Sequence, residues 1–259
     1  MTLEVGQVRL IAFDLDDTLA ESKTPMEPEM AVALARLLRH RLVAIISGGG
    51  YTQFDKQVLA PLPDGTNLPN LHLLPTCGTR YLNYADGAWH QQYAYDLTDD
   101  EKRRAIESLS RHAHRLGFWE LDERVRGERF EDRGSQITFS ALGQMASGDS
   151  KRAWDPTGAK RHALAGAVAV DVPDLQVSAG GSTSIDITRR GVDKAYGIRQ
   201  LSKQTGVPIA QMVFFGDRTE PGGNDHPVVH LGVATVSVTS WRDTLEAVTR
   251  FCDQVEEEK

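Results

Sequence analysis

Four short apolar runs have the length and composition of buried strands in a parallel sheet. They cover residues 8–13, 42–46, 71–74 and 211–215. The segment between the first two runs carries an apolar stripe at helical spacing, formed by Met30, Leu34, Leu37 and Leu38. Strands that alternate with amphipathic helices are typical of an α/β fold, so we expect a doubly wound parallel sheet with helices on its faces.

The middle of the chain follows a different pattern. After a turn at residues 86–87, residues 98–101 form a capping box, which predicts the start of an amphipathic helix. Residues 136–139 and 184–187 alternate apolar and polar side chains, as strands do when one face of their sheet is polar. Residues 154–170 predict a helix, with Pro156 near its start.

These patterns predict two domains. We expect residues 1–86 and 189–259 to form the parallel α/β core. Residues 87–188 are expected to form a separate α+β domain inserted into that core. With 259 residues, of which 40% are hydrophobic, the chain is long enough to bury a core in each domain.

Composition and charge exclude several classes of function. The net charge of −7 argues against a nucleic-acid partner, because phosphates would be repelled by most of the surface. The two cysteines, Cys77 and Cys252, imply neither a disulfide framework nor a zinc cluster. No apolar run reaches the ~18 residues of a membrane-spanning helix, and the amino terminus carries no basic and apolar leader. We therefore expect a cytoplasmic protein with no membrane partner.

The acidic turn at residues 14–18, Asp-Leu-Asp-Asp-Thr, directly follows the first apolar run. Ligands of open α/β sheets bind beyond the carboxyl ends of the strands, which is where Asp14 and Asp16 stand. Two carboxylates in this position can divide the roles of nucleophile and proton donor around one metal ion. A solvated acidic turn before a helix is the alternative, since acids are common at helix starts.

Polar turns follow two further apolar runs. The second run stops at Ser47 and Gly48, where a hydroxyl and backbone amides can bind a phosphoryl oxygen. The last run leads to Asp217 and then to Asp225, and hard oxygen ligands of this type suit Mg²⁺. Because such turns recur at several strand ends, a metal-dependent phosphate site is favoured over ordinary polar turns.

Lys194 lies in the first turn of a predicted helix that ends at Gly206. A cation is electrostatically unfavourable there unless it faces an anion, such as the Asp14 carboxylate or a transferring phosphoryl group. An exposed lysine that points into water is the alternative. His112 and His114 are two residues apart, so they do not share a helix face and are expected at the surface.

Together, these segments resemble the motifs of the haloacid dehalogenase superfamily of aspartyl-phosphate enzymes, in order and over nearly the whole chain. The resemblance implies that Asp14 attacks phosphorus, that Asp16 is the general acid and base, and that Ser47 and Lys194 complete the catalytic set. It also implies Mg²⁺ as cofactor. The residues that this resemblance assigns to the metal are Asp14, the backbone carbonyl of Asp16, Asp217 and, as a ligand or next to one, Asp225.

More narrowly, the chain resembles the subclass whose cap is inserted between the second and third motifs, and the eukaryotic-type phosphomannomutases in particular. The segments that carry this match are residues 216–226, 126–127, 130–143, 180–181, 184 and 186. The resemblance implies that Arg126 and Arg133 grip the phosphate that is not transferred, with Lys23 as a further basic contact. It implies that Ser184 and Asp186 hold sugar hydroxyls.

From the residues alone, these cap assignments have an equal alternative. Arg126 and Arg133 can form a bidentate clamp for an anion, or they can belong to a solvated charged face together with neighbouring acids. Ser184 and Asp186 alternate with isoleucines, so both leave the apolar face and meet either substrate or water.

Two departures from the phosphomannomutase pattern bear on the reaction. Gln144 stands where the mutases have a third cap arginine, so one charge-assisted phosphate contact is lost. Residues 227–232 lack the acidic residue and threonine that form an additional ion site in the mutases.

Weaker capture of the anion favours release and hydrolysis. We therefore expect a Mg²⁺-dependent phosphatase that acts on a small-molecule phosphosugar through an aspartyl-phosphate intermediate. A phosphomannomutase is the alternative, and a catalytically silent sensor of a phosphometabolite is the third hypothesis. The resembling mutases pair through their caps, which makes a homodimer one option.

Overall fold

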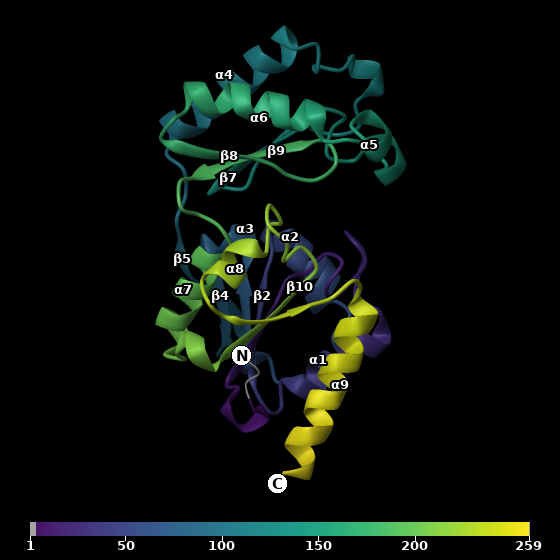
Figure 1. The fold of residues 1–259 in the computed structure, drawn as a ribbon, viewed down its shortest axis with the longest axis vertical. Helices are drawn as coiled ribbons and strands as arrows, with labels where there is room; N and C mark the ends of the chain where they lie inside the picture. Colours follow the sequence, from purple (N-terminus) through teal and green to yellow (C-terminus); the bar gives the residue numbers. More distant parts are fainter. Residues whose placement is uncertain (1–3, 259) are drawn as a thin grey trace. The chain divides into compact units, whose positions relative to one another are not determined.

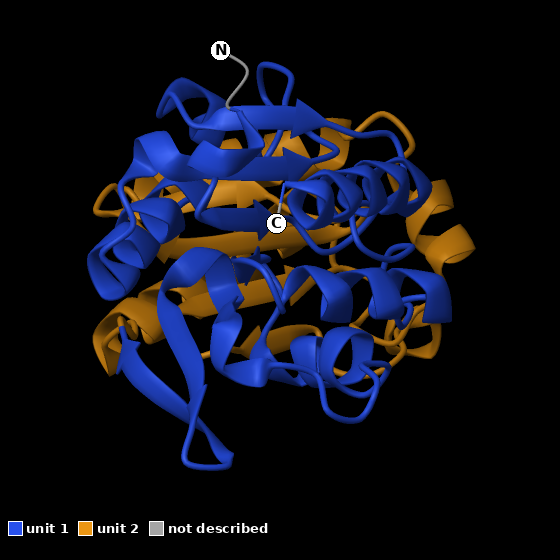
Figure 2. Cartoon of the chain, turned by 90° about the horizontal axis from the view of Figure 1, so that it is seen from below, with its two compact units in different colours: residues 1–94, 193–259 blue, residues 95–192 orange. Residues whose placement is uncertain are grey.

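The computed structural model describes residues 4–258, and Figure 1 labels their helices and strands. The chain divides into two compact units, which are coloured separately in Figure 2. Unit 1 comprises the chain up to Ala94 and from Asp193 onward, and unit 2 comprises Tyr95–Val192. Unit 1 contains a seven-stranded sheet and unit 2 a four-stranded sheet.

The large sheet of unit 1 has the strand order β11-β10-β1-β2-β3-β4-β5, and its first five members pair in parallel. The parallel strands are β1 (Leu10–Phe13), β2 (Leu42–Ile46), β3 (Leu71–Leu74), β10 (Met212–Gly216) and β11 (Ala234–Ser237). The predicted α/β fold with a parallel sheet is therefore confirmed. Both ends of β2 and of β3 agree with the apolar runs from which they were predicted.

Helices cover both faces of this sheet (Figure 1). One face carries α1 (Pro28–Leu37) and α9 (Trp241–Glu257), and the other carries α7 (Lys194–Thr205) and α8 (His226–His230). Strand β1 shows why the strands are apolar throughout, since its alternate side chains enter different cores. Ile11 packs in the cluster that contains Met30, whereas Leu10 packs in the cluster that contains Ile198.

The structure differs from the sequence prediction at both boundaries of the inserted domain. At its end, unit 2 continues to Val192, so residues 189–192 belong to unit 2 and not to the core. The start of the domain differs as well. Strands β4 (Arg80–Ala85) and β5 (Ala88–Ala94) form an antiparallel hairpin that extends the large sheet from β3. The hairpin turn is Asp86-Gly87, with φ of 50° and 79°, as a tight two-residue turn requires. Residues 87–94 therefore belong to unit 1. Their mixed polar pattern is that of an edge strand, which the sequence does not distinguish from a strand of the smaller sheet.

Unit 2 is an antiparallel sheet in the order β6-β7-β9-β8 with helices on one face. Its strands are β6 (Phe130–Asp132), β7 (Gln136–Ser140), β8 (Leu175–Ala179) and β9 (Ser184–Arg189). Its helices are α4 (Asp99–Arg115), α5 (Gly148–Trp154) and α6 (Ala159–Asp171). Leu109, Ile137 and Ile187 are buried in one cluster, which leaves the alternate residues of β7 and β9 on the polar face, as predicted.

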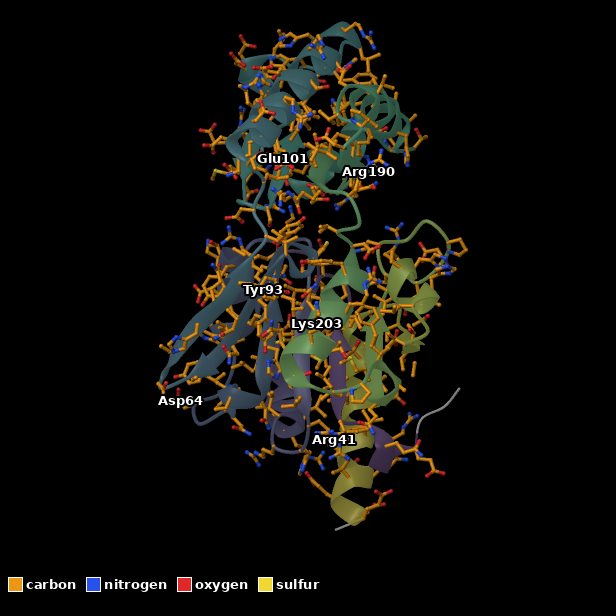
Figure 3. The ribbon with its side chains drawn as sticks, turned by 90° about the vertical axis from the view of Figure 1, so that its left-hand side faces the viewer. Arg41, Asp64, Tyr93, Glu101, Arg190 and Lys203 are labelled. Carbon is orange, nitrogen blue, oxygen red and sulfur yellow. The ribbon has the colours of Figure 1, made fainter. Side chains whose placement is uncertain are left out.

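The predicted capping box at the start of α4 is confirmed. Thr98 Oγ1 accepts a hydrogen bond from the Glu101 amide at 3.2 Å, and the Glu101 carboxylate accepts one from the Thr98 amide at 2.6 Å. The same carboxylate pairs with Arg189 of β9 at 2.9 Å, so the cap also ties α4 to the sheet (Glu101 is labelled in Figure 3).

Two local predictions in unit 2 are wrong. Helix α6 begins at Ala159 and not at residue 154, because α5 ends at Trp154 and the chain then turns through Gly158, which has φ of 78°. The Asp155 carboxylate in this turn accepts hydrogen bonds from the amides of Lys160 and Arg161 in the first turn of α6. His112 is buried and not at the surface, since its Nε2 lies 2.6 Å from Asp171 Oδ2 on α6. Within residues 4–258, no helix has the length and apolar character that crossing a membrane requires.

Candidate active site

Three charged side chains converge beyond the carboxyl ends of β1 and β10. Lys194 Nζ lies 2.7 Å from Asp14 Oδ1 and 2.5 Å from Asp225 Oδ1. The exposed fractions of Asp14, Lys194 and Asp225 are 4%, 1% and 0%. Lysine is almost never buried without a charged partner, and here it has two. The alternative of an exposed Lys194 is therefore wrong.

The first turn of α7 places Lys194. Asp193 caps the helix, because its Oδ1 accepts a hydrogen bond from the Tyr196 amide at 2.7 Å. The helix ends at Gly206 with φ of 69°, as the sequence predicts. A lysine at a helix start is unfavourable with respect to the helix dipole, and the contact with two carboxylates outweighs that cost.

A glycine allows Asp225 to reach this site. A Cβ atom on Gly216 would lie only 2.4 Å from Asp225 Oδ2, which no side chain can tolerate. The same oxygen accepts a hydrogen bond from the Arg218 amide at 3.0 Å, and this bond orients the carboxylate. The residue type at position 216 is thus dictated by the close approach of a carboxylate nine residues later.

Asp14, Asp217 and Asp225 each offer a carboxylate oxygen, and these oxygens lie within 4.8 Å of one another. Carboxylate oxygens are the hard ligands that Mg²⁺ and Ca²⁺ prefer. The donor set therefore fits a divalent cation. Asp14 and Asp217 directly follow two neighbouring parallel strands, and Asp225 directly precedes α8.

The electrostatics of the cluster also favour a bound cation. Burial raises the pKa of Asp14 to about 7; Lys194 opposes this shift, and Asp225 adds to it. Burial also raises the pKa of Asp217, with a further contribution from Asp225. Burial by itself would lower the pKa of Lys194, but Asp14 and Asp225 raise it overall. One lysine does not compensate three clustered carboxylates, so a second cation would favour their ionised forms.

Asp16 has different surroundings from Asp14. Its Oδ1 accepts a hydrogen bond from the Lys23 amide at 2.7 Å and one from Gln57 Nε2 at 3.3 Å. Its Oδ2 accepts a hydrogen bond from Gln53 Nε2 at 3.0 Å. Lys23 has a φ of 62°, and its backbone amide, not its side chain, makes this contact.

Gln53 and Gln57 were not predicted from the sequence. The available signal was a pair of amide side chains four residues apart, directly after the glycine turn that follows β2. Sequence alone could not assign the pair to Asp16, because residues 53 and 57 and residue 16 are brought together only by the fold.

Ser47 is buried at the end of β2, where its Oγ accepts a hydrogen bond from the Gly49 amide at 3.1 Å. A neighbouring turn, α3 (Pro75–Gly78), supports this segment. The amides of Thr76 and Cys77 each donate a hydrogen bond of 2.9 Å, to the carbonyls of Gly49 and Ser47 respectively. Both residues have positive φ, 49° and 56°, which is strained for side chains other than glycine.

Tyr93 of β5, labelled in Figure 3, contacts the last residue of the α3 turn. Its hydroxyl donates a hydrogen bond of 2.7 Å to the Gly78 carbonyl. The segment that begins with Ser47 and Gly48 thus rests on a turn that is itself anchored to the antiparallel edge of the sheet.

Unit 2 gathers several of the remaining predicted residues on its polar face. Asp186 lies opposite Thr138 in the sheet, and its carboxylate accepts a hydrogen bond of 2.7 Å from the Thr138 hydroxyl. Ser184 lies two residues earlier on the same strand. Burial raises the pKa of Asp186, while Arg133 and the Thr138 hydroxyl oppose this shift. Arg133 also pairs with Glu131 at 2.7 Å.

Arg126 and Gln144 lie on two adjoining loops of unit 2, which meet where the Met145 amide donates to the Arg126 carbonyl. The Arg126 guanidinium donates to the backbone carbonyls of Glu123 and Val125 at 2.7 and 2.9 Å. The backbone carbonyl of Gln144 accepts a hydrogen bond of 2.9 Å from the Lys151 ammonium group.

Comparison with known proteins points to one family. A model of the family described as "Eukaryotic phosphomannomutase" matches residues 34–254. A phosphomannomutase from Encephalitozoon cuniculi is 27% identical over 255 residues, covering 95% of this chain and 94% of that protein. One from Spinacia oleracea is 26% identical over 248 residues, covering 92% of this chain and 94% of that protein.

Solved structures with a similar fold are more distant in sequence. A haloacid dehalogenase-like hydrolase from Bacteroides thetaiotaomicron superposes with a TM-score of 0.63 at 14% identity, covering 94% of this chain and 99% of that one. An IMP-nucleotidase from Plasmodium falciparum superposes with a TM-score of 0.67 at 13% identity, covering 94% of this chain and 69% of that one. At these identities the likeness shows a shared fold.

Proposed function

The chain belongs to the eukaryotic phosphomannomutase family of the haloacid dehalogenase superfamily, and from this membership we propose that it transfers a phosphoryl group on a phosphorylated sugar through Asp14. Of the two reactions expected from the sequence, the relatives support interconversion of mannose 1-phosphate and mannose 6-phosphate better than hydrolysis. The observation that carries the proposal is the buried cluster in which Lys194 contacts Asp14 and Asp225, with Asp217 next to them.

In the proposed reaction, an Asp14 oxygen attacks phosphorus in line with the bond to the sugar oxygen. The new bond joins Asp14 to phosphorus, the bond from phosphorus to the sugar oxygen breaks, and Asp16 gives that oxygen a proton. In the second half, a sugar hydroxyl gives its proton to Asp16 and takes the phosphoryl group from Asp14. Water in place of the hydroxyl would make the same enzyme a phosphatase.

Asp14 must be ionised to attack, and two cations would favour that state. Lys194 contributes one positive charge at 2.7 Å. We propose Mg²⁺ as the second cation, bound by carboxylates of Asp14, Asp217 and Asp225 and by the Asp16 backbone carbonyl. When bound, it would screen the repulsion between the attacking carboxylate and the phosphate dianion.

The remaining predicted residues receive proposed roles as substrate contacts. The Ser47 hydroxyl and the Gly48 amide would donate to phosphoryl oxygens, since the Ser47 bond to Gly49 uses only an acceptor position of the hydroxyl. Further residues are proposed to contact the sugar and the phosphate that is not transferred: Lys23, Arg126, Arg133, Gln144, Ser184 and Asp186. Asp186 fits this role because its carboxylate is held in place by Thr138.

A sugar-phosphate phosphatase is the second candidate, and a specific observation favours it. Gln144 stands where the family pattern has an arginine, and its neighbouring cation, Lys151, donates to the backbone carbonyl of the same residue. A bisphosphate intermediate that is held by fewer charges leaves the enzyme more readily, after which water completes the reaction.

The two candidates separate in one experiment. The protein is incubated with Mg²⁺ and mannose 1-phosphate, with and without a hexose 1,6-bisphosphate primer, and products are followed by phosphorus NMR. Primer-dependent formation of mannose 6-phosphate supports the mutase, whereas free phosphate in equal amounts with and without primer supports the phosphatase. Asp14→Asn is the control and should abolish both products. If the wild type is inert on a broad panel of phosphosugars, the proposal is wrong and the silent sensor is favoured.

A further inference from the structure

We propose that Gln53 and Gln57 are positioning residues that orient the carboxyl group of Asp16 for proton transfer with the sugar oxygen. The inference rests on the proposed function, because it assigns a task to residues that contact Asp16 and not the reacting atoms. It starts from the hydrogen bonds that hold both oxygens of Asp16: Gln53 donates to one, and Gln57 and the Lys23 amide donate to the other.

The backbone after β2 brings the two amides to one side of the chain. Helix α2 (Tyr51–Phe54) runs directly into a π-helical turn, Asp55–Leu59, in which the Ala60 amide donates to the Asp55 carbonyl at 2.9 Å. Gln53 and Gln57 are four residues apart, the spacing that places side chains over one another on a helix. Single π-helical turns within α-helices are rare and frequently mark functional sites.

Gln57 is fixed at three points. Its side-chain Nε2 donates to the Thr24 carbonyl at 2.7 Å as well as to Asp16. Its backbone carbonyl accepts a hydrogen bond from the Met26 amide at 2.9 Å. These bonds attach it to the loop that also supplies the Lys23 amide. Asp16, the loop at residues 22–26 and the π-helical turn therefore form one hydrogen-bonded unit.

The burial of Gln57 is hard to explain by packing alone. Its exposed fraction is 3%, and its Oε1 has no hydrogen-bond partner among residues 4–258. A buried acceptor without a partner costs free energy, and an apolar side chain of similar size would avoid that cost. The presence of an amide side chain at residue 57 is explained by the hydrogen bonds that its Nε2 donates, one of which goes to Asp16.

Orientation matters for Asp16 because it must deliver its proton along one direction. The leaving oxygen of a sugar phosphate becomes an alkoxide unless it is protonated as its bond to phosphorus breaks. A leaving group that is already a stable anion, such as dinitrophenolate, needs no proton. Loss of the two glutamines should therefore slow the first kind of substrate and leave the second unaffected.

The test compares single-turnover phosphoryl transfer to Asp14 from mannose 1-phosphate and from 2,4-dinitrophenyl phosphate, in the Mg²⁺-loaded protein. We expect Gln53→Leu and Gln57→Leu to slow transfer from the sugar phosphate by at least about tenfold, within the range for general acid catalysis. Transfer from dinitrophenyl phosphate should stay within about twofold of the wild type. Asp16→Asn sets the upper limit, with the same selectivity and a larger loss.

Gln92→Leu is the matched control. Its Nε2 donates to Asn83 Oδ1 at 2.7 Å on the exposed β4–β5 hairpin, so both rates should remain unchanged. Gln53 is only half-buried, so Gln53→Leu keeps the test valid even if the buried Gln57 does not tolerate substitution.

Each outcome has a defined meaning. Equal slowing of both substrates would show that the glutamines support the whole site and do not orient Asp16, and unchanged rates would show that they do neither; both results overturn the inference while leaving phosphoryl transfer intact. A wild type that transfers from neither substrate would instead overturn the proposed function, and the inference with it.

Discussion

At the scale of single residues, Lys194 is the electrostatic centre of the site. Two carboxylates lie within 2.7 Å of its ammonium group, and all three side chains are buried. Carboxylates in this arrangement repel one another, so the lysine both stabilises the folded protein and favours the ionised form of Asp14 that attack requires.

We expect Lys194→Met to reduce the free energy of unfolding by about 3–5 kcal/mol, because it leaves two buried carboxylates without their cation. Urea denaturation in the absence of metal measures this loss. Lys203→Met, on the exposed side of the same helix (Figure 3), is the control and should change stability by less than about 0.5 kcal/mol. Added Mg²⁺ should stabilise the Lys194 variant more than the wild type; equal stabilisation would contradict a shared cation site.

His72 gives a second prediction at this scale. Burial on β3 lowers the pKa of His72 to about 4, and its Nδ1 lies 2.9 Å from the Tyr81 hydroxyl. The unfolded chain takes up a proton near pH 6.5 that the folded protein does not accept until about pH 4, so stability is lost as the pH falls through this window. Between pH 7 and pH 5 this histidine alone should cost about 2 kcal/mol.

Unfolding free energies at the two pH values test this contribution. His72→Gln should be about 2 kcal/mol less sensitive to the change from pH 7 to pH 5 than the wild type. His90→Gln, at an exposed position of β5, should match the wild type. If the His72 variant loses as much stability on acidification as the wild type, this histidine is protonated in the folded state.

At the scale of elements, the α3 turn stores strain next to the site. Thr76 and Cys77 both adopt left-handed backbone conformations, and their amides hold the carbonyls of Gly49 and Ser47. Conformations of this kind persist only where surrounding contacts enforce them, and they concentrate at functional sites. The turn is therefore a rigid support for the segment that we propose binds the phosphoryl group.

Substitutions at Cys77 should reveal this strain. Asparagine tolerates the left-handed region better than other side chains, so Cys77→Asn should raise the free energy of unfolding by about 0.5–1 kcal/mol. Cys77→Val, with a branched Cβ, should lower it by more than about 1 kcal/mol and should slow phosphoryl transfer, because the amide of residue 77 holds Ser47. Thermal unfolding measures both effects. If Cys77→Val is as stable as Cys77→Asn or more stable, the backbone of the turn is not strained.

At the scale of the whole molecule, the residues that we propose for the reaction come from both units. Unit 1 carries the carboxylates and Lys194, which are common to transfer and hydrolysis. Unit 2 carries the polar residues that we propose contact the rest of the substrate. The balance between interconversion and hydrolysis is therefore expected to depend on unit 2, which contains Gln144, where the resemblance to the mutases implies an arginine.

Gln144→Arg should shift that balance toward interconversion. A charge-assisted hydrogen bond to the second phosphate contributes about 1.5–3 kcal/mol, so the ratio of mannose 6-phosphate to free phosphate should rise by about tenfold or more. Gln144→Leu removes the amide without adding a charge and is the matched control, which should leave the ratio unchanged or lower. An unchanged ratio in the arginine variant would show that position 144 does not contact substrate.

Local patterns in the sequence determined several elements. The bounds of β2 and β3, the capping box of α4 and the limits of α7 were all predictable, because the signals for a strand, a cap or a helix end lie within a few neighbouring residues. The order of the acidic, serine and lysine segments was also sufficient to indicate the superfamily.

Only the tertiary structure decided which of these residues meet. Parallel strands align their carboxyl ends at one edge, and this long-range packing brings Lys194 within 2.7 Å of Asp14 across 180 residues of chain. Backbone pairing assigned β5 to the large sheet, and a hydrogen bond with Asp171 accompanies the burial of His112. Helix α2 and the π-helical turn after it directed Gln53 and Gln57 at Asp16. Each of these outcomes depends on a partner that is distant in sequence, and local propensity contains no information about such partners.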